Sequence, residues 1–161
     1  MCTKIFLALA AVFCVLRAGN AYSINHETEK VVSGQYITVN GRELFVGTDW
    51  IFAPDAQEQC RSIQKNLISF ETAAEYTTLM DYLRANNYNY QVFWTSGVRN
   101  AGESQFYWNA TQTAFTDTFW AYLQPNNALS TQACVQFTVE PDTLALWYDT
   151  PCDEYITFIC E

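Results

Sequence analysis

The sequence predicts a single domain of the α+β class. Two helical patterns come early in the chain, an irregular region rich in Gly, Asn, Thr and Gln follows, and strand patterns cluster at the end. Helices and strands that segregate along a chain in this way are typical of α+β domains. The 161 residues fit one ordinary domain, and a hydrophobic content of 50% provides enough apolar material for a packed core.

The first 21 residues predict a secretory signal peptide. Lys4 provides a basic start, residues 5–16 form an unbroken apolar run, and the small residues Gly19 and Ala21 precede the expected cleavage site. The run is too short to cross a bilayer, which takes about 20 residues, and a buried N-terminal helix is the weaker alternative. We therefore expect a secreted, extracellular protein without membrane insertion.

The charge balance is acidic, with 8 Lys and Arg against 17 Asp and Glu. Cleavage would remove Lys4 and Arg17 and no acid, so the formal charge would change from −9 to −11. Such a surface repels phosphate backbones and anionic lipids, which excludes nucleic acid as an expected partner.

The domain itself is predicted to span residues 34–161, after a polar, aperiodic leader at residues 22–33. Its first element is a β-hairpin over residues 34–48. Two strand-like runs flank Asn40-Gly41, which is a strong signal for a type I′ turn.

Two helices are predicted next, over residues 54–65 and 72–86. Pro54 suits the first turn of the first helix, and Thr72 with Glu75 forms a capping box at the start of the second. Apolar residues recur at helical spacing in both segments and should face the core. They are Ala56, Cys60 and Ile63 in the first helix and Tyr76, Leu79, Met80 and Leu83 in the second.

Beyond Asn86 the regular pattern gives way to short aromatic runs and a long loop at residues 109–133. A loop of that length in a small domain is usually functional. Three strands are predicted to close the chain, at residues 135–139, 144–148 and 155–160. The last run is apolar almost throughout and should be central and buried.

Six cysteines are present, but Cys2 and Cys14 fall in the predicted signal peptide. The four that remain are Cys60, Cys134, Cys152 and Cys160. An even number in an oxidising compartment predicts two disulfides, and the spacing leaves all three pairings open.

The order of cysteines, tryptophans and short motifs resembles the C-type lectin-like domain family, in particular short secreted insect C-type lectins. The resemblance covers about residues 35–161. The matching positions are Cys60, Phe93-Trp94-Thr95-Ser96-Gly97, Trp108, Trp120, Gln124-Pro125-Asn126, Cys134, Leu146-Trp147-Tyr148-Asp149, Cys152 and Phe158-Ile159-Cys160.

This resemblance implies a fold with two helices, small antiparallel sheets and a long irregular ligand loop. It also selects one disulfide pairing, in which Cys60 joins Cys160 and Cys134 joins Cys152.

In sugar-binding members of the family, a calcium ion sits on the long loop and binds the sugar hydroxyls directly. The resemblance implies calcium ligands at Gln124, Asn126, Gln132 and Asp149, with Pro125 in the cis form. The same four residues and Tyr148 are the implied carbohydrate-binding residues. Trp120, Tyr122 and Tyr148 could stack on a sugar or serve the core.

Two of these positions depart from the family pattern. Gln132 stands where a Glu is usual and Tyr148 where an Asn is usual, so Asp149 is the one carboxylate among the matched ligands. Calcium affinity depends on carboxylate number and should fall here. Because Gln124 and Asn126 are both amides, the sequence does not choose between galactose-type and mannose-type sugars.

The leading hypothesis is therefore a secreted lectin that binds galactose- or mannose-type sugars through a degenerate calcium site on the loop, with glycans or glycoproteins as partners. A calcium-independent lectin-like scaffold that binds a protein or another extracellular partner is the alternative. An enzyme is not expected, because the only histidine, His26, lies in the leader. Asn109-Ala110-Thr111 is an N-glycosylation sequon. The oligomeric state stays open.

Overall fold

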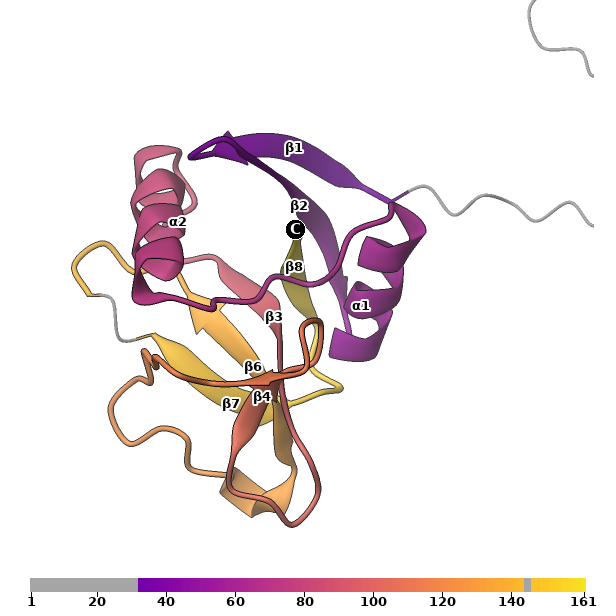
Figure 1. Cartoon of the computed structure of the whole chain (residues 1–161), viewed down its shortest axis with the longest axis vertical. Helices are drawn as coiled ribbons and strands as arrows, with labels where there is room; N and C mark the ends of the chain where they lie inside the picture. Colours follow the sequence, from indigo (N-terminus) through magenta and orange to yellow (C-terminus); the bar gives the residue numbers. More distant parts are fainter. Residues whose placement is uncertain (1–31, 144–145) are drawn as a thin grey trace, which may run out of the picture. The chain divides into compact units, whose positions relative to one another are not determined.

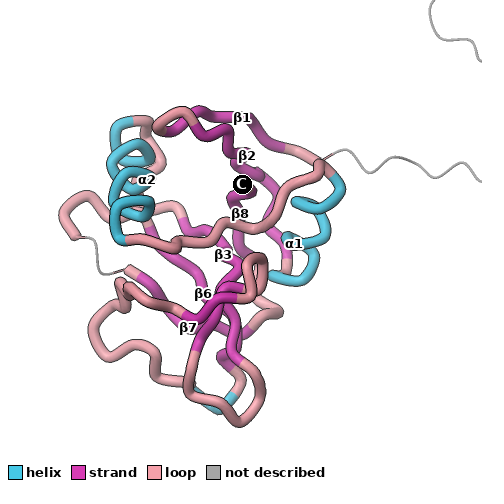
Figure 2. Tube along the Cα trace, viewed as in Figure 1, coloured by secondary structure: helices cyan, strands magenta, loops and turns pink. Residues whose placement is uncertain are grey.

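The computed structural model describes residues 32–143 and 146–161. The predicted signal peptide, most of the predicted leader and His26 lie outside the described residues. Figures 1 and 2 show the arrangement of the elements, which in chain order are β1 (Gly34–Val39), β2 (Arg42–Ile51), α1 (Ala53–Ser62), α2 (Ala73–Ala85), β3 (Val92–Arg99), β4 (Phe106–Trp108), β5 (Thr113–Ala114), the 3-10 helix η1 (Ala128–Ser130), β6 (Gln132–Thr138), β7 (Trp147–Pro151) and β8 (Ile156–Cys160).

The predicted hairpin is present as β1 and β2. The strands pair antiparallel from Gly34↔Gly47 to Val39↔Arg42. The two turn residues, Asn40 and Gly41, have φ of 48° and 80°, as a type I′ turn requires. β2 continues to Ile51, well beyond the predicted end of the hairpin.

Both predicted helices are present. α1 ends at Ser62, three residues earlier than predicted, because Ile63 caps the helix and Gln64 takes a left-handed φ of 60°. α2 begins with the predicted capping box between Thr72 and Glu75. Its whole apolar stripe is buried, so it packs on the core as expected; the stripe comprises Tyr76, Leu79, Met80 and Leu83.

The strands join into one hydrogen-bonded sheet with the order β1-β2-β8-β3-β4-β5, and β6 adds to it by pairing with β3 and β7. β8 is buried at all five positions and central, as predicted for the last apolar run. It pairs antiparallel with β2 and parallel with β3. Figure 1 shows α1 and α2 on either side of these central strands.

The predicted strand at residues 144–148 is misplaced. The observed strand, β7, runs from Trp147 to Pro151 and pairs with β6, with Asp149 opposite Val135. Residues 144 and 145 lie outside the described residues. The error has a physical reason, since the polar pair Asp149-Thr150 looks like loop in the sequence but is buried in the fold.

Two disulfides cross-link the domain with the pairing that the resemblance implies. Cys60 on α1 is bonded to Cys160 on β8, and Cys134 on β6 is bonded to Cys152. Across residues 32–143 and 146–161, no helix has the length and apolar character to span a membrane.

Candidate functional site

The long loop is anchored on Trp147, which is fully buried. The rings of Phe115, Phe119 and Trp120 lie 5.4, 5.6 and 6.0 Å from its indole. The backbone adds two bonds, from Ala121 N–H to the Trp147 carbonyl at 3.0 Å and from Trp147 N–H to the Phe119 carbonyl at 2.8 Å. Trp120, one of the stacking candidates from the sequence, is thus half-buried in the aromatic core.

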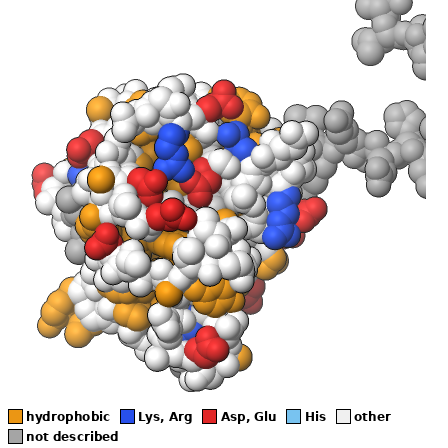
Figure 3. Space-filling view, in the orientation of Figure 1, with side chains coloured by type: hydrophobic (Ala, Val, Ile, Leu, Met, Phe, Trp, Pro, Cys, Tyr) orange, Lys and Arg blue, Asp and Glu red, His pale blue; other side chains and the backbone are white. Residues whose placement is uncertain are grey.

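The next two residues of the loop point into solvent. Tyr122 is 91% exposed and Leu123 is 72% exposed. Figure 3 shows hydrophobic side chains standing out at the lower left, where the orange loop lies in Figure 1. The peptide bond that follows, Gln124-Pro125, is cis, as the resemblance implies.

Asp149 is 1% exposed and its carboxylate clamps the loop segment that follows Pro125. Its Oδ1 accepts a hydrogen bond from the Asn126 backbone N–H at 2.9 Å, and its Oδ2 accepts one from the Asn127 N–H at 2.7 Å. Charge-assisted bonds of this kind are the strong ones in proteins. Both oxygens of the one predicted carboxylate ligand therefore hold backbone.

Two of the other predicted ligands converge on a single donor. Asn126 Oδ1 accepts from the Ala128 N–H at 2.9 Å, and Gln132 Oε1 accepts from the same N–H. Gln124 Oε1 is buried without a hydrogen-bond partner among the described residues. Three predicted site residues, Asn126, Gln132 and Asp149, thus meet in one cluster. No hydrogen bond among the described residues joins the Gln124 side-chain oxygen to it.

Tyr148 does not join this cluster. It lies on β7 next to Asp149, and successive side chains of a strand point to opposite faces. Tyr148 is paired across the sheet with Gln136 and is half-buried.

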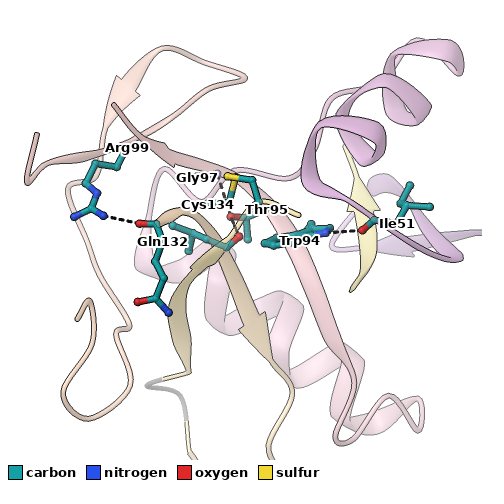
Figure 4. Close-up of a disulfide and its surroundings, with 9 residues drawn as sticks. Ile51, Trp94, Thr95, Gly97, Arg99, Gln132 and Cys134 are labelled. Atoms are coloured by element: carbon teal, nitrogen blue, oxygen red, sulfur yellow. Dashed lines mark hydrogen bonds between the residues drawn. A yellow bond between two sulfur atoms is a disulfide. The ribbon is translucent and has the colours of Figure 1, made fainter. Parts of the chain in front are cut away.

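Arg99, at the end of β3, is a site residue that the sequence did not reveal. Its Nη2 donates to Asn127 Oδ1 and to the Gln132 carbonyl, both at 2.5 Å. Figure 4 shows the guanidinium directed at Gln132, which lies on β6 two residues before the disulfide-bonded Cys134. The available signal was slight: an Arg in a chain with only 8 basic residues, two positions after the Trp94–Gly97 motif.

These residues do not fit a calcium ion. Ca²⁺ takes six to eight oxygen ligands, but here one carboxylate is present and both of its oxygens already face N–H donors. The positively charged Arg99 guanidinium lies beside Asn127 and Gln132, where it would repel a cation. In the part of the chain that the structure describes, no group of three or more His, Cys, Asp or Glu could hold a metal.

Asn109 of the sequon lies at the turn after β4 and is partly exposed. Its N–H donates to the Ser96 carbonyl at 2.8 Å, and its Oδ1 accepts from Gln112 Nε2 at 3.1 Å. The side-chain nitrogen that would carry a glycan takes part in neither bond. Its glycosylation stays a prediction.

The fold, its two disulfides and the long loop define a class of domain, and similarity to known proteins identifies that class. The family model of the lectin C-type domain matches residues 52–161. The chain belongs to this family.

Individual relatives support the same assignment. C-type lectin 37Da of Drosophila melanogaster is 27% identical over 152 residues, which cover 91% of this chain and 78% of that protein. The structure of the C-type lectin CEL-I from Cucumaria echinata superposes with a TM-score of 0.66 at 19% identity, over 78% of this chain and 92% of that one. A calcium-independent type II antifreeze protein gives a TM-score of 0.63 at 19% identity, over 78% and 88% of the two chains. At such identities the two solved structures establish the fold alone.

Proposed function

We propose that this chain is a secreted lectin that binds neutral glycans through the long loop, without calcium. The observation that carries the proposal is that the loop exposes an aromatic ring and, four residues later, an amide side chain. Tyr122 is 91% exposed, and the nearby Asn126 is exposed and held through its backbone by Asp149. Aromatic faces and amide groups together suit the apolar face and the hydroxyls of a sugar.

The Asn126 side chain is oriented for this role. Its Oδ1 accepts from Ala128 N–H, which directs the remaining amide nitrogen away from the backbone. That nitrogen can donate to a sugar hydroxyl of the galactose or mannose type. Hydroxyls that the family binds through an ion would here meet protein groups directly.

Several observations support the absence of an ion from the binding step. The Asp149 carboxylate is already used by two backbone amides, and Arg99 supplies a positive charge beside Asn127. The same fold carries a calcium-independent antifreeze protein. The two disulfides and the predicted signal peptide support secretion.

A glycan array probed with and without chelator tests the proposal. We expect binding that the chelator does not change, and a loss of about tenfold, roughly 1.4 kcal/mol, for Tyr122→Ala. Asn126→Ala should weaken binding in the same direction. Tyr155→Ala is the matched control, because Tyr155 is 63% exposed but lies outside the loop. Absence of binding in both conditions would refute a lectin function.

A protein partner is the second candidate, and Leu123 favours it. The side chain is 72% exposed and cannot hydrogen-bond to a sugar. If the loop binds a protein, Leu123→Asn will abolish complex formation with that protein while Asn126→Ala has little effect. The reverse order of effects would favour glycan binding.

A further inference from the structure

A groove lies away from the long loop. It has a volume of about 500 Å³ and opens between the last part of β2 and the connection from α2 to β3. That volume lies within the ~300–1,000 Å³ typical of small-molecule sites. None of its lining residues belongs to the loop of residues 109–133.

Two exposed aromatic rings line this groove. Trp50 is 65% exposed and Tyr90 is 70% exposed. The pairing of β2 with β8 shifts register between Gly47 and Ile51, and Trp50 lies in that irregular stretch. Large exposed aromatics are costly in water, so two of them lining one groove point to a ligand that covers them.

The backbone holds Tyr90 in a conformation that bulky residues rarely adopt. Its φ is 66°, in the left-handed region. Its N–H donates to the Val139 carbonyl at 2.6 Å, and the Val139 N–H donates to the Gln91 carbonyl at 2.9 Å. Backbone strain of this kind persists where the surroundings enforce it and clusters at functional sites.

Polar side chains also line the groove. Gln35 Nε2 donates to the Tyr88 hydroxyl, and Thr157 Oγ1 donates to the Val92 carbonyl at 2.5 Å. The exposed Gln91 side chain also lines the groove, and no hydrogen bond to it is formed within the described residues. The groove therefore offers both amide and hydroxyl groups to a ligand.

Every side chain that lines the groove is neutral, although the chain has 17 acidic residues. A charged ligand would find no counter-charge there, and a purely apolar one would leave the Gln91 side chain unpaired. We infer that this groove is a second carbohydrate site, which takes a neutral saccharide. A sugar ring stacks on Trp50 and Tyr90, and its hydroxyls bond to Gln35 and Gln91.

The exposure of Trp50 provides a direct readout. Of the five tryptophans, Trp94, Trp108 and Trp147 are fully buried and Trp120 is half-buried. Quenching of tryptophan fluorescence by acrylamide therefore reports mainly on Trp50. The full chain is titrated with lactose, maltose, mannobiose and diacetylchitobiose, and a neutral Gly/Ser/Pro peptide is titrated in parallel.

We expect at least one disaccharide to protect Trp50 from acrylamide quenching, and this protection should reach a plateau as the disaccharide concentration rises. Tyr90→Ala and Gln35→Ala should each weaken that protection at least about tenfold, with an unchanged near-ultraviolet circular dichroism spectrum. Tyr155→Ala is the control variant. Tyr122→Ala should leave the protection unchanged, which separates this groove from the long-loop function.

Three outcomes would overturn the inference. The first is that none of the four disaccharides protects Trp50 from quenching. The second is that folded Gln35→Ala and Tyr90→Ala variants are protected as strongly as the parent protein. The third is that the peptide protects Trp50 and the disaccharides do not. If Tyr90→Ala fails to fold, Gln35→Ala on β1 decides the result by itself.

Discussion

The guanidinium of Arg99 lies over the ring of Phe106, with 5.2 Å between its central carbon and the ring centroid. The two residues are paired partners at the ends of β3 and β4. From this position Arg99 donates hydrogen bonds to both Asn127 and Gln132. One cation therefore connects β3 and β4 to both ends of the loop segment 127–132.

Loss of this cation should loosen the loop. Arg99→Ala removes two hydrogen bonds and a cation–π contact, and we expect it to lower the free energy of unfolding by about 2 kcal/mol. Arg99→Lys keeps the charge but not the planar fork and should recover part of the loss. Urea denaturation measures both. The exposed Arg61→Ala is the control, expected within about 0.5 kcal/mol of the parent; an equal loss there would contradict the role of Arg99.

The carboxylate of Asp149 should stabilise the folded protein by holding the backbone of the loop, rather than by binding a metal. Asp149→Ala leaves the N–H groups of Asn126 and Asn127 without their acceptor, and we expect a loss of about 3 kcal/mol. Amide hydrogen exchange at these two residues should accelerate in the variant. Asp153→Asn, at an exposed acid, should change neither quantity. Unaltered exchange at Asn127 in Asp149→Ala would show that the clamp is not formed in solution.

Calcium should leave the thermal stability of the protein unchanged. An ion at ten times its dissociation constant would stabilise the fold by about 1.4 kcal/mol, which calorimetry readily detects. We expect no such shift between millimolar calcium and chelator, because both Asp149 oxygens already accept N–H donors. A clear rise in melting temperature that Asp149→Asn abolishes would show that the loop rearranges around the ion.

The pH dependence of stability should carry a contribution from Glu161. Burial raises the pKa of Glu161 above its ordinary value of 4.5, while the Ser69 N–H and Arg42 pull that pKa down. A raised pKa in the folded state means that this contribution to stability is complete below about pH 4 and is lost as the pH rises through the folded pKa. Denaturation curves from pH 3.5 to 7 should show a smaller decline for Glu161→Gln than for the parent. An identical decline in both proteins would contradict this assignment.

The two disulfides should differ in how much they stabilise the fold. Cys134 and Cys152 are 18 residues apart, and their replacement by Ala should cost about 3 kcal/mol in the loop-entropy account. Cys60 and Cys160 are 100 residues apart, and their replacement should cost nearly 5 kcal/mol. Denaturation of the two double variants tests the order, and a greater loss for Cys134/Cys152 would contradict it.

Local signals in the sequence were sufficient for the early elements. The Asn40-Gly41 turn and the Thr72–Glu75 capping box act within a few residues, so their prediction needed no tertiary information. The position predicted for β7 was wrong because Asp149 is buried against backbone amides of a segment more than 20 residues earlier in the chain. Only the three-dimensional fold brings those partners together.

The candidate site shows the same division. The motif supplied Gln124, Asn126, Gln132 and Asp149, and hydrogen bonds in the structure connect the last three of these residues through the backbone of residues 126–128. Their bonding could not be read from residue types, since a carboxylate can face an ion or an N–H equally well. Arg99 escaped notice because its contacts to Asn127 and Gln132 span 28 and 33 residues.

The central position of β8 has a consequence for synthesis of the protein. β8 is the last of the described strands in chain order, yet it lies between β2 and β3. A chain emerging from the ribosome therefore has an open sheet until the final strand arrives, and the thiol of Cys60 meets those of Cys134 and Cys152 before that of Cys160. For a secreted chain, as proposed above, maturation should therefore depend on thiol exchange that corrects early pairings of Cys60.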